Sequence, residues 1–266
     1  MLIAQISDMH LKGEGELLFG RIDTTGFLER AVAHVNALDP RPDIVLATGD
    51  LVNDGGLEQY ANLKRALAPL KMPVFLIPGN HDARDAMRAA FPEHDYLPAK
   101  GFLQYTVEGL PVRLIALDTL APGKGHGELC DERLDWLEAR LAESDRPTLI
   151  FMHHPPFKCG IGYLDREGLN KGGQRLSELV RAHGNVERVV AGHVHRPIQV
   201  RWAGTLASTA PSTAHQATLD LRPVETLSMM MEPPAIALHL WREGTGLITH
   251  TSYVGNYDGP KPFRQM

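Results

Sequence analysis

Five short apolar runs, rich in β-branched residues, recur along the chain, and each ends at a loop whose side chains can bind a metal. The runs cover residues 2–6, 44–48, 74–77, 148–152 and 186–191. Runs of this length and composition are typical of strands buried in a parallel sheet. In an open α/β sheet, ligand sites lie outside the carboxyl ends of the strands. The five loops are therefore expected to meet at one edge of the fold.

The loops contain the residue types that a pair of divalent metal ions needs. Their motifs are Asp8-Met9-His10, Gly49-Asp50, Gly79-Asn80-His81-Asp82, His153-His154 and Gly192-His193-Val194-His195. Imidazole, carboxylate and amide oxygen together suit Zn, Mn, Fe or Co, and one carboxylate can bridge two cations through its two oxygens. Each motif alone can be a chance polar turn. Their joint occurrence at five strand ends predicts a dinuclear metal site and hydrolytic chemistry.

Helical periodicity between the strand-like runs indicates the fold class. Apolar residues recur at helical spacing in residues 24–38, 57–70, 131–141 and 171–183. Residues 102–108 and 112–117 have the pattern of two paired strands. Strands that alternate with helices predict an α/β fold with a mainly parallel sheet. After residue 196 the pattern changes, and residues 209–234 show no clear periodicity.

The composition is that of a globular protein without an affinity for large polyanions. Lys and Arg number 27 against 32 Asp and Glu, so the formal charge is −5, which argues against a nucleic-acid duplex or a membrane surface as partner. No apolar run approaches the roughly 20 residues of a membrane span. The two cysteines form no evident framework, and the first residues have the pattern of a core strand rather than a signal peptide. A cytoplasmic location is expected.

The order of the motifs resembles that of the calcineurin-like metallophosphoesterases. Asp-x-His, Gly-Asp, Gly-Asn-His-Asp, a later His and Gly-His-x-His follow one another here as in that family. The opening Leu-Ile-Ala-Gln-Ile-Ser-Asp, residues 77–82 and residues 152–156 are similar to bacterial glycerophosphodiesterases and class III cyclic-nucleotide phosphodiesterases. The resemblance implies a four-layer α-β-β-α metallophosphoesterase sandwich with a small C-terminal cap or dimerisation segment.

The resemblance also implies which side chains hold the metals. Seven residues are implied as ligands of two divalent ions, Mn, Fe, Zn or Co: Asp8, His10 and His195 for the first metal, Asn80, His153 and His193 for the second, and Asp50 as the bridge between them. Every motif position of the family is filled. The chain is therefore expected to bind both metals.

Five further residues are implied around the reacting phosphorus. Two metals would lower the pKa of a bridging water, and the resulting hydroxide would attack phosphorus in line. His81 is the candidate for contacting the phosphoryl group or the leaving oxygen, and Asp82 for fixing the tautomer of that imidazole. Asn53, His215 and Phe19 match substrate-binding positions of the glycerophosphodiesterase-like group.

Three regions are expected along the chain. Residues 1–204 would form the catalytic core, 205–245 a cap that makes a dimer and limits substrate size, and 246–266 a C-terminal strand and tail packing on the core. The apolar residues of the cap, including Met229 to Met231, have no periodic partner face within the segment. Such unpaired apolar surface commonly marks an association site, and the matching region pairs subunits in the resembling enzymes. A homodimer or higher homo-oligomer is therefore expected.

The expected activity is hydrolysis of small phosphodiesters, either glycerophosphodiesters or cyclic nucleotides. A phosphomonoesterase of the same superfamily is the alternative, although no pair of arginines stands beside the motifs to bind the additional charge of a monoester. A nuclease fits the acidic balance poorly. A scaffold that kept the fold and lost catalysis should have replaced several ligands, whereas this chain has replaced none.

Overall fold

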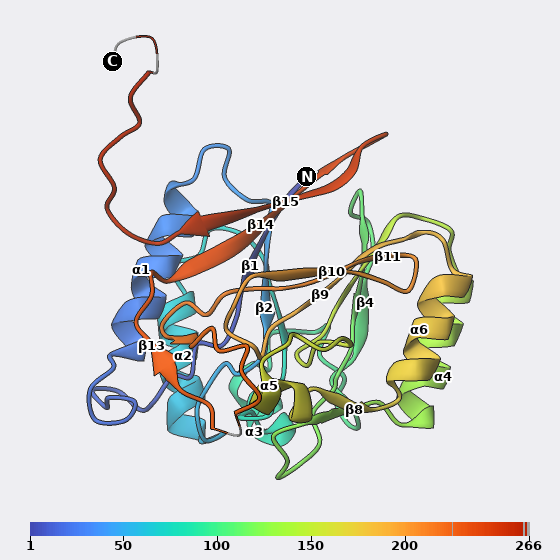
Figure 1. Ribbon diagram of the computed structural model, residues 1–266, viewed down its shortest axis with the longest axis horizontal. Helices are drawn as coiled ribbons and strands as arrows, with labels where there is room; N and C mark the ends of the chain where they lie inside the picture. The colour runs from blue at the N-terminus through green and yellow to red at the C-terminus, as the bar shows by residue number, and fades with distance from the viewer. Residues whose placement is uncertain (225, 263, 265–266) are drawn as a thin grey trace.

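Two β-sheets lie face to face, and helices cover the outer face of each sheet (Figure 1). The computed structural model describes residues 1–224, 226–262 and 264. From left to right in Figure 1 the layers are helices, sheet, sheet and helices. This arrangement confirms the four-layer α-β-β-α sandwich expected from the sequence.

The five-stranded sheet has the order β15-β14-β1-β2-β3. In that order its strands are Gly246–Tyr253, Ala235–Arg242, Leu2–Ile6, Ile44–Thr48 and Val74–Ile77. β1, β2 and β3 are parallel, whereas β14 is antiparallel to both of its neighbours. The register pairs Leu2 with Leu240, so a hairpin near the end of the chain completes the sheet that the first strand begins.

The six-stranded sheet has the order β10-β11-β9-β7-β5-β4. In that order its strands are Ile198–Trp202, Thr205–Thr209, Val186–Ala191, Thr148–Phe151, Arg113–Ala116 and Tyr105–Val107. The four inner strands are parallel, and the two edge strands are antiparallel to their neighbours. The paired strands expected at 102–108 and 112–117 are β4 and β5.

Each sheet packs against its own set of helices. α1 (Thr24–Ala37), α2 (Leu57–Leu67) and α3 (Arg84–Ala90) cover the five-stranded sheet. α4 (Asp131–Ala142) and α6 (Gly173–Ala182) cover the six-stranded sheet. The short elements α5 (Gly162–Arg166), β6 (Gly127–Glu128) and β8 (Leu169–Lys171) lie near the carboxyl ends of the strands. α6 begins later than the expected 171 because residues 169–171 pair with β6.

Alternation along β2 places its side chains in two different cores. Ile44 and Leu46 pack between the two sheets, and Val45 and Ala47 pack against the helices α1 to α3. Successive side chains of a strand point to opposite faces of its sheet, so a continuous apolar run can fill both layers. A strand buried on both faces is what the unbroken apolar sequence of β2 indicates.

A buried polar bridge ties together three strands that end at ligand loops. Gln5 on β1 donates through Nε2 to Thr48 Oγ1 on β2 and to the Ala191 carbonyl on β9, both at 2.9 Å. Its Oε1 lies 3.0 Å from His239 Nε2 on β14. Because these side chains are buried, the bridge fixes the ends of β1, β2 and β9 relative to one another.

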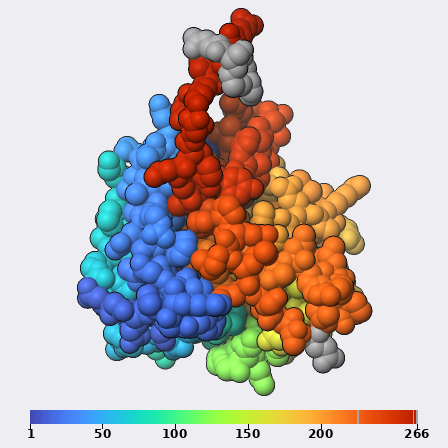
Figure 2. All heavy atoms as spheres, turned by 60° about the vertical axis from the view of Figure 1, so that its left-hand side comes forward, coloured from blue at the N-terminus to red at the C-terminus, as the bar shows by residue number. Residues whose placement is uncertain are grey.

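The stretch 205–245 joins both sheets at its ends. Residues 205–209 form β11 and residues 235–242 lie in β14, so these parts belong to the core sheets. Residues 210–217 are buried. The exposed part of the stretch comprises residues 218–224 and 226–234. It follows β12 (Gln216–Ala217) and contains β13 (Met229–Met230). This orange part lies beside the blue N-terminal part (Figure 2). The periodicity of the sequence alone did not reveal these long-range strand pairings.

In the C-terminal region, β15 packs on the core and residues 255–262 do not; the expectation for residues 263, 265 and 266 falls outside the described residues. β15 pairs along its length with β14, and Val254 is buried. Residues 255–262 are exposed and lead away from the sheets (Figure 1). No helix in the described parts of the chain is long and apolar enough to span a membrane.

Candidate metal centre

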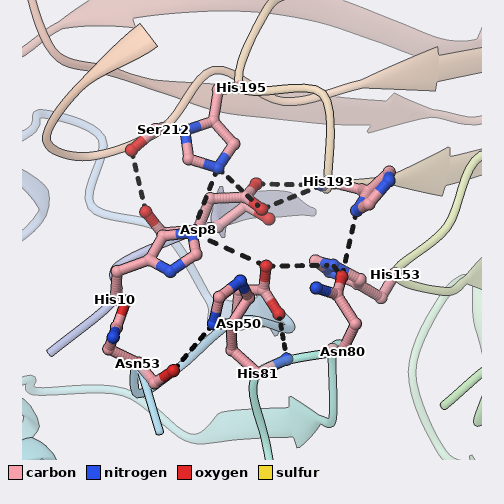
Figure 3. A network of polar contacts seen from close by, with 12 residues as sticks. Asp8, His10, Asp50, Asn53, Asn80, His81, His153, His193, His195 and Ser212 are labelled. Atoms are coloured by element: carbon pink, nitrogen blue, oxygen red, sulfur yellow. Dashed lines mark hydrogen bonds and ion pairs between the residues drawn. The ribbon is translucent and has the colours of Figure 1, made fainter. Parts of the chain in front are cut away.

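The seven predicted metal ligands meet at the carboxyl ends of β1, β2, β3, β7 and β9 (Figure 3). Asp50 stands between the others. Its Oδ2 lies 3.5 Å from His10 Nε2 on one side and 3.4 Å from His153 Nε2 on the other. Its other oxygen, Oδ1, accepts the backbone N–H of His81 at 2.9 Å. This carboxylate is therefore placed to serve both sides of a dinuclear centre.

The first half of the centre, defined as Asp8, His10 and His195, combines two imidazoles with one carboxylate. The two Nε2 atoms of His10 and His195 lie 3.1 Å apart. His195 Nε2 lies 3.5 Å from Asp8 Oδ1. The three groups come from the loops after β1 and β9, so two strands from different sheets form this half.

The second half, defined as Asn80, His153 and His193, is arranged around an amide oxygen. Asn80 Oδ1 lies 3.1 Å from His153 Nε2 and 3.1 Å from His193 Nδ1. These ligands follow β3, β7 and β9 respectively. The amide oxygen only accepts hydrogen bonds, so an imidazole N–H or a cation between the three side chains can satisfy it.

The hydrogen bonds behind the imidazoles fit two bound cations. His153 Nδ1 lies 2.8 Å from the Thr48 carbonyl, and His195 Nδ1 lies 2.9 Å from the His215 carbonyl. A carbonyl oxygen only accepts, so both Nδ1 atoms carry hydrogen and both Nε2 atoms are left to face the centre. There they face other acceptors, which a divalent ion would satisfy. The residues therefore fit a pair of such ions.

Burial sets the protonation of the centre. It lowers the pKa of His193 to about 3 and the pKa of His195 to about 4, so both are neutral at pH 7, the form that binds a metal. It raises the pKa of Asp8 to about 7, and a nearby dication would favour the carboxylate. Burial also disfavours a charged His153, but Asp50 and Asp8 outweigh it and raise that pKa to about 9. Without metals, a proton supplies the positive charge at His153.

Unusual backbone conformations aim the ligands inward. Five ligands are left-handed, with φ of 54° at Asp8, 47° at His10, 47° at Asp50, 70° at His193 and 50° at His195. This conformation is unfavourable for residues with a Cβ, and it persists where the surrounding structure enforces it, commonly at functional sites. The concentration of such residues in these loops marks the centre independently of residue type.

Two motif glycines allow the loops to approach one another. A Cβ on Gly79 would stand 2.3 Å from the Asp50 amide nitrogen, and one on Gly192 would stand 2.1 Å from Ser7 Oγ. Neither approach is possible for a residue with a side chain. The glycines of Gly-Asn-His-Asp and Gly-His-x-His are thus required by close packing of the ligand loops.

His81 lies beside the bridging carboxylate, and its ring is held by a backbone carbonyl. Its Nδ1 lies 2.7 Å from the Asn53 carbonyl oxygen. Nδ1 therefore donates, which leaves Nε2 for a substrate. The His81 ring also stands edge-on to the His10 ring, with centroids 4.7 Å apart. This position supports the expectation that His81 acts next to the metals.

Asp82 does not orient His81, contrary to the expectation from the sequence. Its carboxylate accepts the backbone N–H groups of Gly79 at 2.8 Å and Leu51 at 3.1 Å, and the Tyr60 hydroxyl at 2.9 Å. These donors from Gly79, Leu51 and Tyr60 occupy both oxygens of the carboxylate. Asp82 therefore braces the loops after β2 and β3, and the Asn53 carbonyl holds the His81 ring.

A cavity of 220 Å³ opens over the ligands, and the three predicted substrate-binding residues line it together with His81. The His215 ring lies 4.8 Å from the His195 ring and 6.3 Å from the Phe19 ring, measured between centroids. Phe19 is 68% exposed, whereas phenylalanine is usually a buried residue type. Asn53, His215 and Phe19 are thus brought together beside the first half of the centre.

Sequence reasoning missed other residues of the cavity wall: Tyr163, Leu164, Glu167 and Leu227. Leu164 and Leu227 also border an adjoining cavity of 200 Å³, together with Met229. These residues lie in or beside short, irregular segments, so no periodicity or motif marked them. Among the described residues lining the 220 Å³ cavity, none is Lys or Arg.

Comparison with known proteins agrees with this geometry. The sequence profile of the calcineurin-like phosphoesterases matches residues 1–197. The chain is 40% identical to a probable glycerophosphodiester phosphodiesterase, GpdQ, of Arcobacter nitrofigilis, over 99% of this chain and 97% of that protein. It is 31% identical to the 3′,5′-cyclic adenosine monophosphate phosphodiesterase CpdA of Escherichia coli K12, over 80% of this chain and 76% of that protein.

Solved structures show the same fold. A dimetal phosphatase from Danio rerio superposes with a TM-score of 0.67 over 96% of this chain and 99% of that chain, at 17% identity. At that identity the likeness concerns the fold alone. The profile match covers all seven predicted ligands and most of both sheets. The chain belongs to the calcineurin-like phosphoesterase family.

Proposed function

We propose that this chain is a phosphodiesterase that uses two divalent metal ions to hydrolyse small phosphodiesters. The position of Asp50 carries the proposal, because one of its oxygens lies within 3.5 Å of an imidazole nitrogen from each half of the centre. The cavity above it also contains His81. The 40% identity to a probable glycerophosphodiester phosphodiesterase over nearly the whole chain supports the same activity.

The residues around the cavity have distinct parts in this reaction. Two divalent ions bound in the centre would supply an activated water and neutralise charge on the phosphoryl oxygens. The Asn53 carbonyl accepts from His81 Nδ1, so His81 Nε2 can hold a proton for the leaving oxygen. The side chains of Phe19 and His215 border the space beside His81 and would position the leaving group.

A phosphodiester suits the cavity better than a phosphomonoester. A monoester carries about one more negative charge, and no Lys or Arg is among the described residues that line the cavity. Phe19, Leu164 and Leu227 give one wall an apolar surface, which the second ester group would contact. The relatives named above are phosphodiesterases of glycerophosphodiesters and of a cyclic nucleotide. The 220 Å³ volume admits a small diester and not a nucleic-acid duplex.

A substrate panel tests the proposal. Chelated protein would be supplied with Mn, Co, Zn or Fe and assayed on glycerophosphodiesters, on 3′,5′- and 2′,3′-cyclic nucleotides and on a phosphomonoester. We expect hydrolysis only with metal and faster turnover of a diester than of the monoester. Full activity in a verified metal-free sample contradicts the metal mechanism, and a preference for the monoester supports the alternative phosphatase function.

We also propose that the chain forms a homodimer through the exposed stretch that comprises residues 218–224 and 226–234. Its large exposed apolar side chains are Leu219, Leu221, Leu227, Met230 and Met231. Several exposed apolar side chains within one stretch favour association. Light scattering should show at least a dimer, and replacing Met229 to Met231 with serine should weaken it. A stable monomer would contradict this assignment.

A cytoplasmic location stays a prediction.

A further inference from the structure

A buried segment beyond the family match lies directly against the first half of the metal centre. Residues 210–217 follow β11 and are buried, although the matched region ends at residue 197. The segment contributes none of the seven predicted ligands. Its contacts with the ligand loops are nevertheless direct, and they are concentrated on one half of the centre.

The segment donates hydrogen bonds to the backbone carbonyls of two consecutive residues, Ser7 and Asp8. Ser212 donates through Oγ to the Asp8 carbonyl at 2.8 Å, and the Thr213 N–H donates to the Ser7 carbonyl at 3.3 Å. The same Ser212 hydroxyl accepts the Ala214 N–H at 3.0 Å, which orients it. Asp8 has a left-handed φ of 54°, so a hydrogen bond that fixes its carbonyl opposes a strong tendency to relax.

The segment also orients the other end of the first half. The His215 carbonyl accepts from His195 Nδ1 at 2.9 Å, which directs the Nε2 lone pair of His195 toward His10. Arg196, the next residue, donates to the Ala217 carbonyl at 2.6 Å and pairs with Glu232 at 2.6 Å. The loop after β9 is thus tied to the segment at two consecutive residues.

The second half has a different support. The Thr48 carbonyl that orients His153 belongs to β2, inside the five-stranded sheet. None of the hydrogen bonds from residues 210–217 to described residues reaches the side chains of Asn80, His153 or His193. The outer supports of the two halves therefore come from different parts of the chain. One direct link joins the halves: the His193 N–H donates to the Asp8 carboxylate, at 2.9 Å to Oδ1 and 3.1 Å to Oδ2.

We propose that residues 210–217 position the ligands of the first metal: Ser212 as a positioning residue for Asp8, and the His215 carbonyl as the group that orients His195. The proposal rests on the two-metal site of the proposed function. Removing Ser212 Oγ should let Asp8 relax and should selectively lower the affinity of the first half for its metal. Loss of such an outer partner typically lowers metal affinity about 10–100-fold.

The test measures metal binding rather than hydrolysis. His10→Ala leaves the second half as the intact site, and Asn80→Ala leaves the first. Ser212→Ala is added to each background, and Mn²⁺ is titrated while the EPR signal of the free ion is recorded. We expect Ser212→Ala to weaken binding of the remaining Mn²⁺ about 10–100-fold in the Asn80→Ala protein. In the His10→Ala protein the loss should be much smaller, because Asp8 reaches the second half through a single backbone N–H, that of His193.

Two further variants keep the result interpretable. Ser208→Ala removes a buried hydroxyl of β11 that takes no part in these hydrogen bonds, so it should change Mn²⁺ affinity in neither background. Thermal melts of the chelated proteins check folding, and Ser212→Cys, compared with Ser208→Cys, replaces the alanine pair if Ser212→Ala does not fold.

The outcomes separate the two proposals. Equal weakening in both backgrounds, weakening only in the His10→Ala protein, or no change in the Asn80→Ala protein overturns the role of the segment. A chain that binds two Mn²⁺ ions with the expected selectivity but hydrolyses no diester overturns the proposed function and leaves this inference standing. A wild-type chain that binds no Mn²⁺ overturns both.

Discussion

The two halves of the metal centre are alike at the ligands and different behind them. Each half takes its side chains from loops at strand ends, and each has Asp50 within 3.5 Å of one of its imidazoles. Behind His153 stands the carbonyl of Thr48 in a core strand. The Asp8 carbonyl accepts a hydrogen bond from Ser212, which lies 204 residues later in the sequence. A motif therefore identifies a ligand, whereas the support of that ligand depends on where a distant part of the chain passes.

The largest effect is expected at the residue that the halves share. Asp50→Asn removes the negative charge between them, so both halves should lose Mn²⁺ and hydrolysis should be abolished. Metal content by atomic emission and turnover of a diester measure the two effects. Asp85→Asn, at an exposed carboxylate of α3 that pairs with Arg88, serves as the control and should retain both. Loss of one ion only would show that the halves do not share this carboxylate.

The next largest effect separates chemistry from metal binding. His81→Ala should keep both metals and lose roughly 10²–10⁴-fold in kcat, because Nε2 no longer serves the leaving oxygen. The loss should shrink for a diester with a good leaving group. His250→Ala, at an exposed position on β15, should behave as wild type. An unchanged kcat on a poor-leaving-group diester would remove His81 from the mechanism.

An intermediate effect concerns the buried polar bridge around Gln5, which includes His239 and fixes the ends of β1, β2 and β9. Burial, with the nearby Arg188 cation, lowers the pKa of His239 to about 3. The pKa of His239 is lower in the folded state than its unfolded value of 6.5, so the unfolded state binds a proton more readily. The contribution of His239 to the free energy of unfolding is therefore complete above pH 6.5 and is lost as the pH falls toward 3. Between pH 6.5 and 5 the loss is about 2 kcal/mol. The free energy of unfolding of the chelated protein, measured in urea at pH 6.5 and pH 5, should therefore fall less in His239→Gln than in the wild type, by that amount. Identical pH dependence in both proteins would contradict it.

The smallest effect tests how far the support of the first half extends. Glu232→Gln breaks the partly exposed pair with Arg196, and such pairs contribute at most about 1 kcal/mol. Mn²⁺ affinity in the Asn80→Ala protein should therefore fall by no more than about fivefold. Asp220→Asn, which breaks an exposed pair with Arg222 in the same stretch, should have no effect. A large loss in Glu232→Gln would mean that the exposed stretch itself holds His195.

The parts of the molecule that could be predicted from the sequence are those with local signals. The ligand-bearing strands are mainly apolar runs, and the run of β2 is nearly unbroken because this strand is buried on both faces. The metal-binding residue types then follow within a few positions. Asp50, His81 and the other motif residues were predicted at their observed positions for the same reason.

The parts that could not be predicted depend on long-range contacts. β14 pairs with β1 across nearly the whole chain, so the sequence around residue 240 gave no indication of its neighbour. Residues 210–217 are buried, and hydrogen bonds to Ser7 and Asp8 hold them in place. Their sequence has no amphipathic pattern that would indicate this burial. Asp82 was assigned to its sequence neighbour His81, although the turn at Gly79 draws its carboxylate elsewhere. In each case the deciding partner is set by the fold.

The shared position of Asp50 is tested most directly by locating the metals. Anomalous diffraction from a crystal grown with Mn²⁺ would place each ion without reference to activity. We expect two peaks, one among Asp8, His10 and His195 and one among Asn80, His153 and His193, each in contact with Asp50. A single peak, or two peaks of which one lies away from Asp50, would contradict the dinuclear centre on which the proposed function rests.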